Sequence, residues 1–132
     1  MAIQTLETLL GDKLLRDELL AKYTAARLGG QADFLYVAKD SVEELGEVVS
    51  TAWQGDFPVR VIGGGANVLV SDSGVRGLVV INKVSEITHG DWHDGRTVSA
   101  TSGASLTALA NKCLAWGYRG MEWAVSVPGT VG

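Results

Sequence analysis

The chain of 132 residues carries a net charge of −4, with 46% apolar and 20% charged residues. This length and composition indicate one globular domain and exclude a disordered chain. Scattered Lys and Arg residues without a basic patch argue against a nucleic-acid partner. No apolar run approaches the roughly 20 residues of a membrane span. The single cysteine, Cys113, excludes an internal disulfide and favours a cytoplasmic location.

The N-terminal part of the chain predicts a helix, a strand and a second helix. Leucines recur at near-helical spacing over residues 5–21, which predicts a helix there that Gly11-Asp12 can break. Residues 33–38 are rich in β-forming types and predict a strand. Residues 41–44 read Ser-Val-Glu-Glu, a capping-box sequence that predicts the start of a helix. The apolar residues after this cap share one helical face: Val42, Leu45, Val48, Val49, Ala52 and Trp53.

Five more strands and a third helix are expected after residue 57. The strands fall at residues 58–62, 68–70 and 77–81, and then on both sides of an Asp94-Gly95 pair that is typical of a two-residue hairpin turn. Ser105 as N-cap and Gly117 as stop signal bound the third helix. This order predicts an α+β domain with mixed β-sheets and flanking helices, and no regular βαβ alternation.

A glycine-rich loop separates the strands expected at 58–62 and 68–70. It comprises Gly63, Gly64, Gly65, Ala66, Asn67 and Val68. The dinucleotide fingerprint GxGxxG does not apply because Val68 stands at its last glycine, and the Walker sequence does not apply because the loop has no lysine. Main-chain amides free of Cβ atoms can instead face an anion together, so the loop is either a phosphate cradle or a plain turn.

A second segment with open backbone lies at residues 120–132. Its candidate ligand-facing residues are Ser126, Pro128, Gly129, Thr130 and Gly132. Two loops of this kind can hold a diphosphate from both sides. The pair therefore favours a phosphate-binding function over a plain turn.

Two histidines and the cysteine have simpler interpretations. His89 and His93 are four residues apart, which suits a metal site on a helix, but Gly90 and the turn signal after His93 favour a solvated hairpin. Cys113 falls on the apolar face of the third helix and is interpreted as a small buried hydrophobic residue. No metal site is expected.

Four motifs, in this order, resemble the UDP-N-acetylenolpyruvoylglucosamine reductase family, also called the UDP-N-acetylmuramate dehydrogenases. They are Tyr23-Thr24 with residues 27–34, then residues 61–70, 74–81 and 120–132. The resemblance runs from about Leu19 to the last residue. It implies an FAD-binding domain of the PCMH type, similar to vanillyl-alcohol oxidase, with a first subdomain at about 20–84 and the start of a second at about 85–132.

The resemblance also assigns cofactor contacts. It implies that the amides of residues 63–68 hold the FAD pyrophosphate, that residues 126–132 lie along the pyrophosphate and adenosine, and that Ser102 and Gly103 approach the cofactor. FAD is expected to be non-covalent because neither histidine lies in the glycine loop. Three residues depart from the common pattern of the family: Tyr23, Ala66 in place of a serine, and Val127.

The implied reaction reduces UDP-N-acetylglucosamine enolpyruvate to UDP-N-acetylmuramate for peptidoglycan, with NADPH as hydride donor. The resemblance implies that the rest of the FAD domain, the substrate-binding domain and the catalytic residues follow Gly132, so we assign no catalytic residue and expect the isolated chain to be inactive. Two alternatives stay open: the FAD-binding domain of another PCMH-type oxidoreductase, and a non-catalytic nucleotide-binding module.

Overall fold

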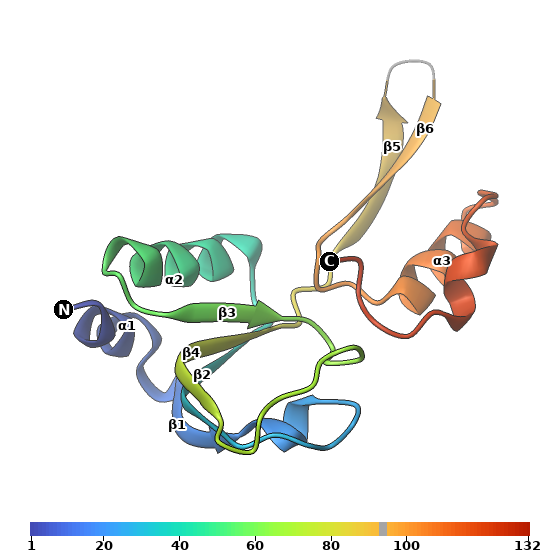
Figure 1. The fold of residues 1–132 in the computed structure, drawn as a ribbon. Coiled ribbons are helices and arrows are strands. Elements are labelled where there is room, and N and C mark those ends of the chain that lie inside the picture. The colour runs from blue at the N-terminus through green and yellow to red at the C-terminus, as the bar shows by residue number, and fades with distance from the viewer. Residues whose placement is uncertain (93–94) are drawn as a thin grey trace.

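A computed structural model describes residues 1–92 and 95–132, in which the strands form two separate sheets (Figure 1). The four-stranded sheet has the order β1-β2-β4-β3. Strand β1 runs antiparallel to β2, whereas β4 runs parallel to both β2 and β3. The other sheet is an antiparallel hairpin of β5 and β6. The bounds of the strands are β1 Leu14–Leu19, β2 Gln31–Ala38, β3 Val59–Ile62, β4 Val75–Asn82, β5 Ile87–Trp92 and β6 Gly95–Ala100.

Helices cover both sheets, and together with the mixed pairing they confirm the predicted α+β class. Among the described residues, no helix is long and apolar enough to cross a membrane. Figure 1 shows α2 along the four-stranded sheet and α3 beside the hairpin. The α-helices are α1 Ala2–Leu10, α2 Val42–Gln54 and α3 Leu106–Ala115, and the 3-10 helices are η1 Gly11–Lys13, η2 Leu20–Tyr23 and η3 Glu122–Ser126.

Strand β4 is the centre of the first sheet and is buried on both faces. Leu78 and Val80 pack with the buried residues of α1 and α2, while Val79 and Ile81 pack on the opposite face, where Leu20 of η2 lies. A strand covered on both sides needs no polar alternation, which explains its continuous apolar run. The two faces together form the core of the first-sheet region, residues 1–84.

A separate apolar cluster supports the hairpin region, residues 85–132. Ile87 of β5, Ala104, and Leu109 and Cys113 of α3 are its buried members. Cys113 is a free, buried thiol, as its place on the apolar helix face predicts. His89 in β5 lies in the same region, with its ring 4.2 Å from that of Trp116. In the described residues, no group of three or more His, Cys, Asp or Glu side chains is arranged to hold a metal ion.

The prediction of one helix over residues 5–21 is wrong beyond Gly11. The backbone turns at Gly11, with a φ of 51°, into η1, and Leu14–Leu19 then form β1, in which Leu14 pairs with Tyr36 of β2. Leucine spacing alone did not distinguish helix from strand there, and pairing with the edge of β2 decides the outcome. Residues 68–70 are also not a strand but an irregular loop.

The helix signals downstream are confirmed. The Ser41 side chain accepts a hydrogen bond from the Glu44 amide at 3.0 Å, Ser105 accepts one from the Ala108 amide at 3.3 Å, and Gly117 follows α3 with a φ of 73°. The predicted apolar face of α2 is only partly buried, since Trp53 is 70% exposed.

The predicted hairpin is present, with Gly95 opposite Trp92. Gly95, predicted as a turn residue, is instead the first residue of β6, so that part of the prediction is wrong. His93 and Asp94 lie outside the described residues, and a turn at Asp94 stays a prediction. Residues 120–132, predicted as a segment with open backbone, contain the short 3-10 helix η3.

Candidate cofactor site

The glycine loop of residues 63–68 begins where β3 ends, beside the end of its parallel neighbour β4. In parallel sheets, ligands bind at the carboxyl ends of strands. The carbonyl of Gly65 accepts a hydrogen bond from the Ala25 amide at 2.9 Å. Among the hydrogen bonds of the described residues, none is donated by a main-chain amide of residues 63–68. No hydrogen bond within the described part of the chain therefore occupies these donors.

The three glycines of the loop differ in what a side chain at their position would meet. A Cβ on Gly63 would lie 2.5 Å from Thr130 Oγ1, so Gly63 lets the C-terminal segment approach the loop. Gly65 has a φ of 66°, and a Cβ there would lie 2.1 Å from the Tyr23 carbonyl oxygen. Gly64 has neither constraint, because its φ is outside the left-handed region and a Cβ would meet nothing within 4 Å. Gly64 is exposed, and without a side chain its backbone stays uncovered on the outer surface of the loop.

The C-terminal segment forms a second wall next to the loop. The Val131 amide donates to the Ala104 carbonyl and the Gly132 amide to the Ser102 carbonyl, both at 2.9 Å. Thr130 forms a β-bridge with Ser105. These contacts attach the segment to the turn that precedes α3 and bring it against the glycine loop.

A cavity of about 180 Å³ lies between the two walls. Its lining residues are Val61, Ile62, Gly63, Asn82, Ser102, Thr130 and Gly132. Four of the predicted cofactor residues, Gly63, Ser102, Thr130 and Gly132, are therefore gathered around one space. None of these described lining residues is charged, so the polar contacts they offer come from main-chain groups, two hydroxyls and one amide.

The other predicted residues lie in different surroundings. Gly129, with a φ of 121°, approaches Ala66, since a Cβ on it would lie 3.9 Å from the Ala66 Cβ. Val68 lines a different cavity. The remaining residues fall into two groups: exposed Gly64, Asn67, Ser126 and Pro128, and buried Gly65 and Gly103.

Gly103 has a packing reason to be glycine. A Cβ there would lie 2.6 Å from Asn82 Oδ1 and 2.6 Å from the Val84 carbonyl oxygen. Its small size therefore lets the turn before α3 lie against the end of β4, next to the cavity but not along its lining.

Asn82 is a site residue that the sequence prediction missed. Its side chain is only 5% exposed, its Nδ2 donates to Ser102 Oγ at 2.9 Å, and its Oδ1 accepts from the Val84 amide at 3.1 Å. Because the Val84 N–H must donate to an oxygen, the side-chain atom of Asn82 that it contacts is Oδ1 and the other is Nδ2. Nδ2 carries two protons and uses one for Ser102, so its second proton remains near the cavity. The signal in the sequence that could have identified it is its place as a polar residue directly after the apolar run of β4.

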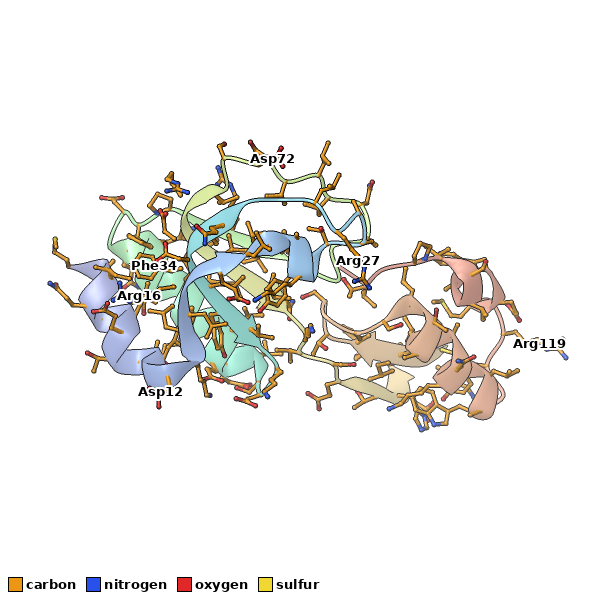
Figure 2. All side chains as sticks on the ribbon, turned by 90° about the horizontal axis from the view of Figure 1, so that it is seen from below. Asp12, Arg16, Arg27, Phe34, Asp72 and Arg119 are labelled. Carbon is orange, nitrogen blue, oxygen red and sulfur yellow. The ribbon has the colours of Figure 1, made fainter. Side chains whose placement is uncertain are left out.

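Arg27, the first residue of the motif at residues 27–34, is a cationic side chain near this site. Its amide donates to the Thr24 carbonyl at 3.1 Å, and the adjacent Ala25 amide contacts the glycine loop. Figure 2 shows Arg27 on the side of the first sheet that faces the hairpin region. Among the described residues, Arg27 takes part in no ion pair. Its charge is therefore not neutralised within that part of the chain.

Comparison with known proteins identifies the class. The sequence model of a family described as "FAD binding domain" matches residues 35–132, and the chain belongs to this family. Its relatives include the UDP-N-acetylenolpyruvoylglucosamine reductase of Rubrobacter xylanophilus, 42% identical over 116 residues, which are 88% of this chain and 38% of that protein. The enzyme of the same name from Nostoc punctiforme is 40% identical over 113 residues, 86% of this chain and 33% of that protein.

A solved structure gives the same result for the fold. The crystal structure of UDP-N-acetylenolpyruvylglucosamine reductase from Thermus caldophilus aligns with a TM-score of 0.61 and 28% identity, over 87% of this chain and 38% of that chain. The chain thus spans between 33% and 38% of the length of these relatives.

Proposed function

We propose that this chain is the FAD-binding portion of a UDP-N-acetylenolpyruvoylglucosamine reductase, and that the amides of residues 63–68 hold the FAD pyrophosphate without a covalent bond. The observation that carries the proposal is the set of loop amides around Gly64 that donate no hydrogen bond within the described residues. In that same part of the chain, neither backbone strain nor a close contact requires a glycine at position 64. Membership of the FAD-binding family supplies the ligand class.

The residues present suit a diphosphate. Main-chain N–H groups bind anions without a side-chain charge, and hydrogen bonds to ionised oxygens are stronger than neutral ones. The Ser102 and Thr130 hydroxyls add donors at the cavity, and Asn82 orients Ser102. Ala66 offers no hydroxyl, so the loop acts through its backbone. The other predicted contacts, Gly103, Ser126, Pro128, Gly129 and Gly132, are proposed to line the adenosine end or to shape the second wall.

The flavin supplies hydride-transfer chemistry when bound, and the protein supplies binding and orientation. We further propose that the whole enzyme uses NADPH to convert UDP-N-acetylglucosamine enolpyruvate to UDP-N-acetylmuramate in the cytoplasm, and so serves peptidoglycan synthesis, cell shape and cell division. More than half the length of the relatives has no counterpart in these 132 residues. The substrate-binding domain and catalytic residues are proposed to belong there, and the first-sheet and hairpin regions to be the two FAD subdomains.

FAD binding by the 132-residue chain tests this proposal. Quenching of flavin fluorescence should give saturable binding, weaker than in a complete enzyme because only part of the cleft is present. Gly64→Ala should weaken binding by about tenfold, through loss of contact with the loop amides, and should leave the urea midpoint of the free protein unchanged. Gly46→Ala is the matched control, because Gly46 also has open space around it but lies in α2.

Two results would count against the proposal. Absence of saturable binding by the unmodified chain contradicts FAD binding by this portion. Equal FAD affinity of Gly64→Ala and Gly46→Ala contradicts the assignment of the loop. Gly65→Ala serves as a structural reference and should lower stability even without FAD, because of its positive φ and its contact with Tyr23.

A further inference from the structure

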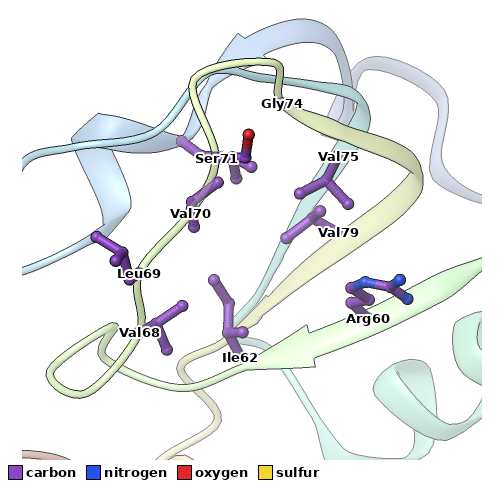
Figure 3. A pocket seen from close by; sticks show the side chains of 10 residues that line it. Arg60, Ile62, Val68, Leu69, Val70, Ser71, Gly74, Val75 and Val79 are labelled. Atoms are coloured by element: carbon purple, nitrogen blue, oxygen red, sulfur yellow. The ribbon is translucent and has the colours of Figure 1, made fainter.

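A second cavity, of about 200 Å³, lies on the face of the first sheet that carries Leu20 and Val79 (Figure 3). The irregular loop of residues 68–74, here called the strap, passes over this face between the glycine loop and β4. The lining side chains are mostly aliphatic: Leu20, Ile62, Val68, Leu69, Val70, Val75 and Val79, with Arg60, Ser71 and Gly74. This cavity shares only Ile62 with the lining of the cofactor cavity.

The strap is firmly attached on the side away from the glycine loop. The Gly30 amide donates to the Ser71 carbonyl at 2.9 Å, and the Gly74 amide donates to the same carbonyl at 3.0 Å. A Cβ on Gly30 would lie 2.2 Å from the Asp72 carbonyl oxygen, so this glycine permits close contact between two main-chain segments. One bond from Gly30 and one bond within the strap therefore hold this end of the strap beside the cavity.

Arg60 is the feature that indicates a ligand class. It lies on β3, an edge strand, in register with Val79 and two residues before Ile62, so its side chain leaves the sheet on the cavity side. Figure 3 shows Arg60 at one end of the aliphatic cluster. Among the described residues, no carboxylate pairs with Arg60. Arg60 is exposed, and a charged side chain on an edge strand also opposes pairing with other chains, a role that is compatible with a ligand contact.

We propose that the cavity beneath the strap binds a small amphiphilic carboxylate, with its apolar body among the aliphatic side chains and its carboxylate at Arg60. An apolar cavity of about 150 Å³ accommodates benzene, so the larger space here fits one ring with a short carbon arm. Arginine pairs with carboxylates through two parallel hydrogen bonds, which fixes the orientation of such a ligand. This binding site does not depend on the proposed FAD function.

Titration with 3-phenylpropionate, followed by ¹H–¹⁵N NMR of the 132-residue chain, tests the proposal. We expect saturable shifts of the amides of residues 60–62 and 68–71, with a Kd on the order of 1–10 mM for a ligand of this size. The neutral analogue 3-phenylpropan-1-ol should bind about tenfold more weakly, because it lacks the charge that pairs with Arg60.

Arginine variants sharpen the test. Arg60→Gln should reduce the affinity for 3-phenylpropionate about tenfold and leave that for the alcohol unchanged. Arg119→Gln makes the same charge change on a side chain that Figure 2 shows at the far end of the hairpin region, and it should have no effect. Arg60→Lys keeps the charge and should retain part of the affinity. It also serves as the second variant if circular dichroism shows that Arg60→Gln is unfolded.

Equal affinities for the acid and the alcohol would overturn the proposal, as would shifts confined to residues 63–67 or no saturation at 50 mM ligand (about five times the weakest Kd expected). FAD affinity should be the same in Arg60→Gln and the unmodified chain. If neither the unmodified chain nor Arg60→Gln binds FAD, the result contradicts the proposed function and leaves the proposal for this cavity intact.

Discussion

The first-sheet region and the hairpin region are stabilised to different degrees. In the first region, β4 is buried on both faces between two apolar clusters, and it has paired strands on both sides. In the second, a two-stranded hairpin with mostly exposed residues is supported by α3 on one side, and η3 packs on α3. Isolated two-stranded hairpins are marginally stable in water. The hairpin region therefore depends on its one small cluster and on its contacts with the first region.

This difference explains how the candidate cofactor site is divided. The glycine loop extends from the strongly packed region, whereas Ser102, Thr130 and Gly132 belong to the weakly packed one. A ligand that binds both walls stabilises the region that opens most easily. We therefore expect FAD to increase the stability of the hairpin region more than that of the first sheet.

Leu78→Ala should have the largest effect of the substitutions considered. Leu78 is 1% exposed in the middle of β4, and truncation of a buried leucine costs about 2–5 kcal/mol of unfolding free energy. Leu109→Ala, at 8% exposure in α3, should cost less and act within the hairpin region. Urea unfolding gives the free energies, and amide hydrogen exchange locates them. Equal loss of protection in both regions for both variants would contradict the comparison.

Asn82→Leu should separate the two regions. It leaves the Val84 amide without its acceptor, and an unsatisfied buried donor costs about 1–3 kcal/mol. It also removes the bond that orients Ser102. We expect lower exchange protection of the Val84 and Val131 amides and about tenfold weaker FAD binding. Asn111→Leu, on the exposed side of α3, is the control and should change neither quantity. Normal FAD affinity of Asn82→Leu would argue that Ser102 does not need this support.

The two serine caps provide a smaller, matched test. Ser41→Ala and Ser105→Ala each remove one side-chain acceptor from a helix N-terminus, at a cost of about 1 kcal/mol. Because α2 packs on the first sheet, the Ser41 change should lower global stability. The Ser105 change should increase local opening of α3, and FAD should reverse this increase. If FAD protects α2 and α3 equally, the proposed division of the site is wrong.

The sequence predicted elements whose signals are local. The capping box at Ser41 and the cap at Ser105 identified two helices, and apolar runs identified β2, β3 and β4. It failed at β1, because leucines near residues 14–20 fit either period and only the partner strand decides between them. The strand predicted at residues 68–70 failed for a related reason, since no strand of the described part pairs with it, and the carbonyl of the adjacent Ser71 accepts instead from the Gly30 amide of a distant loop.

The glycine loop and the second glycine segment were found from the sequence, but not the reasons for each residue. Gly63 is explained by contact with Thr130, and Gly103 by contact with Asn82, both distant in sequence. Such contacts leave no periodic pattern. Asn82 itself was missed because a single polar residue at the end of a strand is common, and its two hydrogen bonds become visible only in three dimensions.

Tyr36→Phe should have the smallest effect at neutral pH. The Tyr36 hydroxyl is buried and has no hydrogen-bond partner in the described part of the chain, so its removal should change the unfolding free energy by less than about 1 kcal/mol. Burial is the main cause that raises the pKa of Tyr36 to about 12, and the nearby Glu44 carboxylate adds to it. This raised pKa makes the residue a sensor of the first-sheet core at alkaline pH.

The sign of the alkaline effect follows from this pKa. In the unfolded chain the phenol ionises near its ordinary value of 10, whereas in the folded chain it keeps its proton until the pH approaches 12. Stability is therefore lost as the pH rises through this window, and Tyr36→Phe should lose less of it. Asp40 and Glu44 also raise the pKa of Lys13 by accepting its hydrogen bonds at 2.9 and 2.7 Å, but this contribution is present in both proteins. Urea midpoints at pH 7 and pH 11 isolate the difference, and identical alkaline losses would show that the phenol is not buried in the folded core.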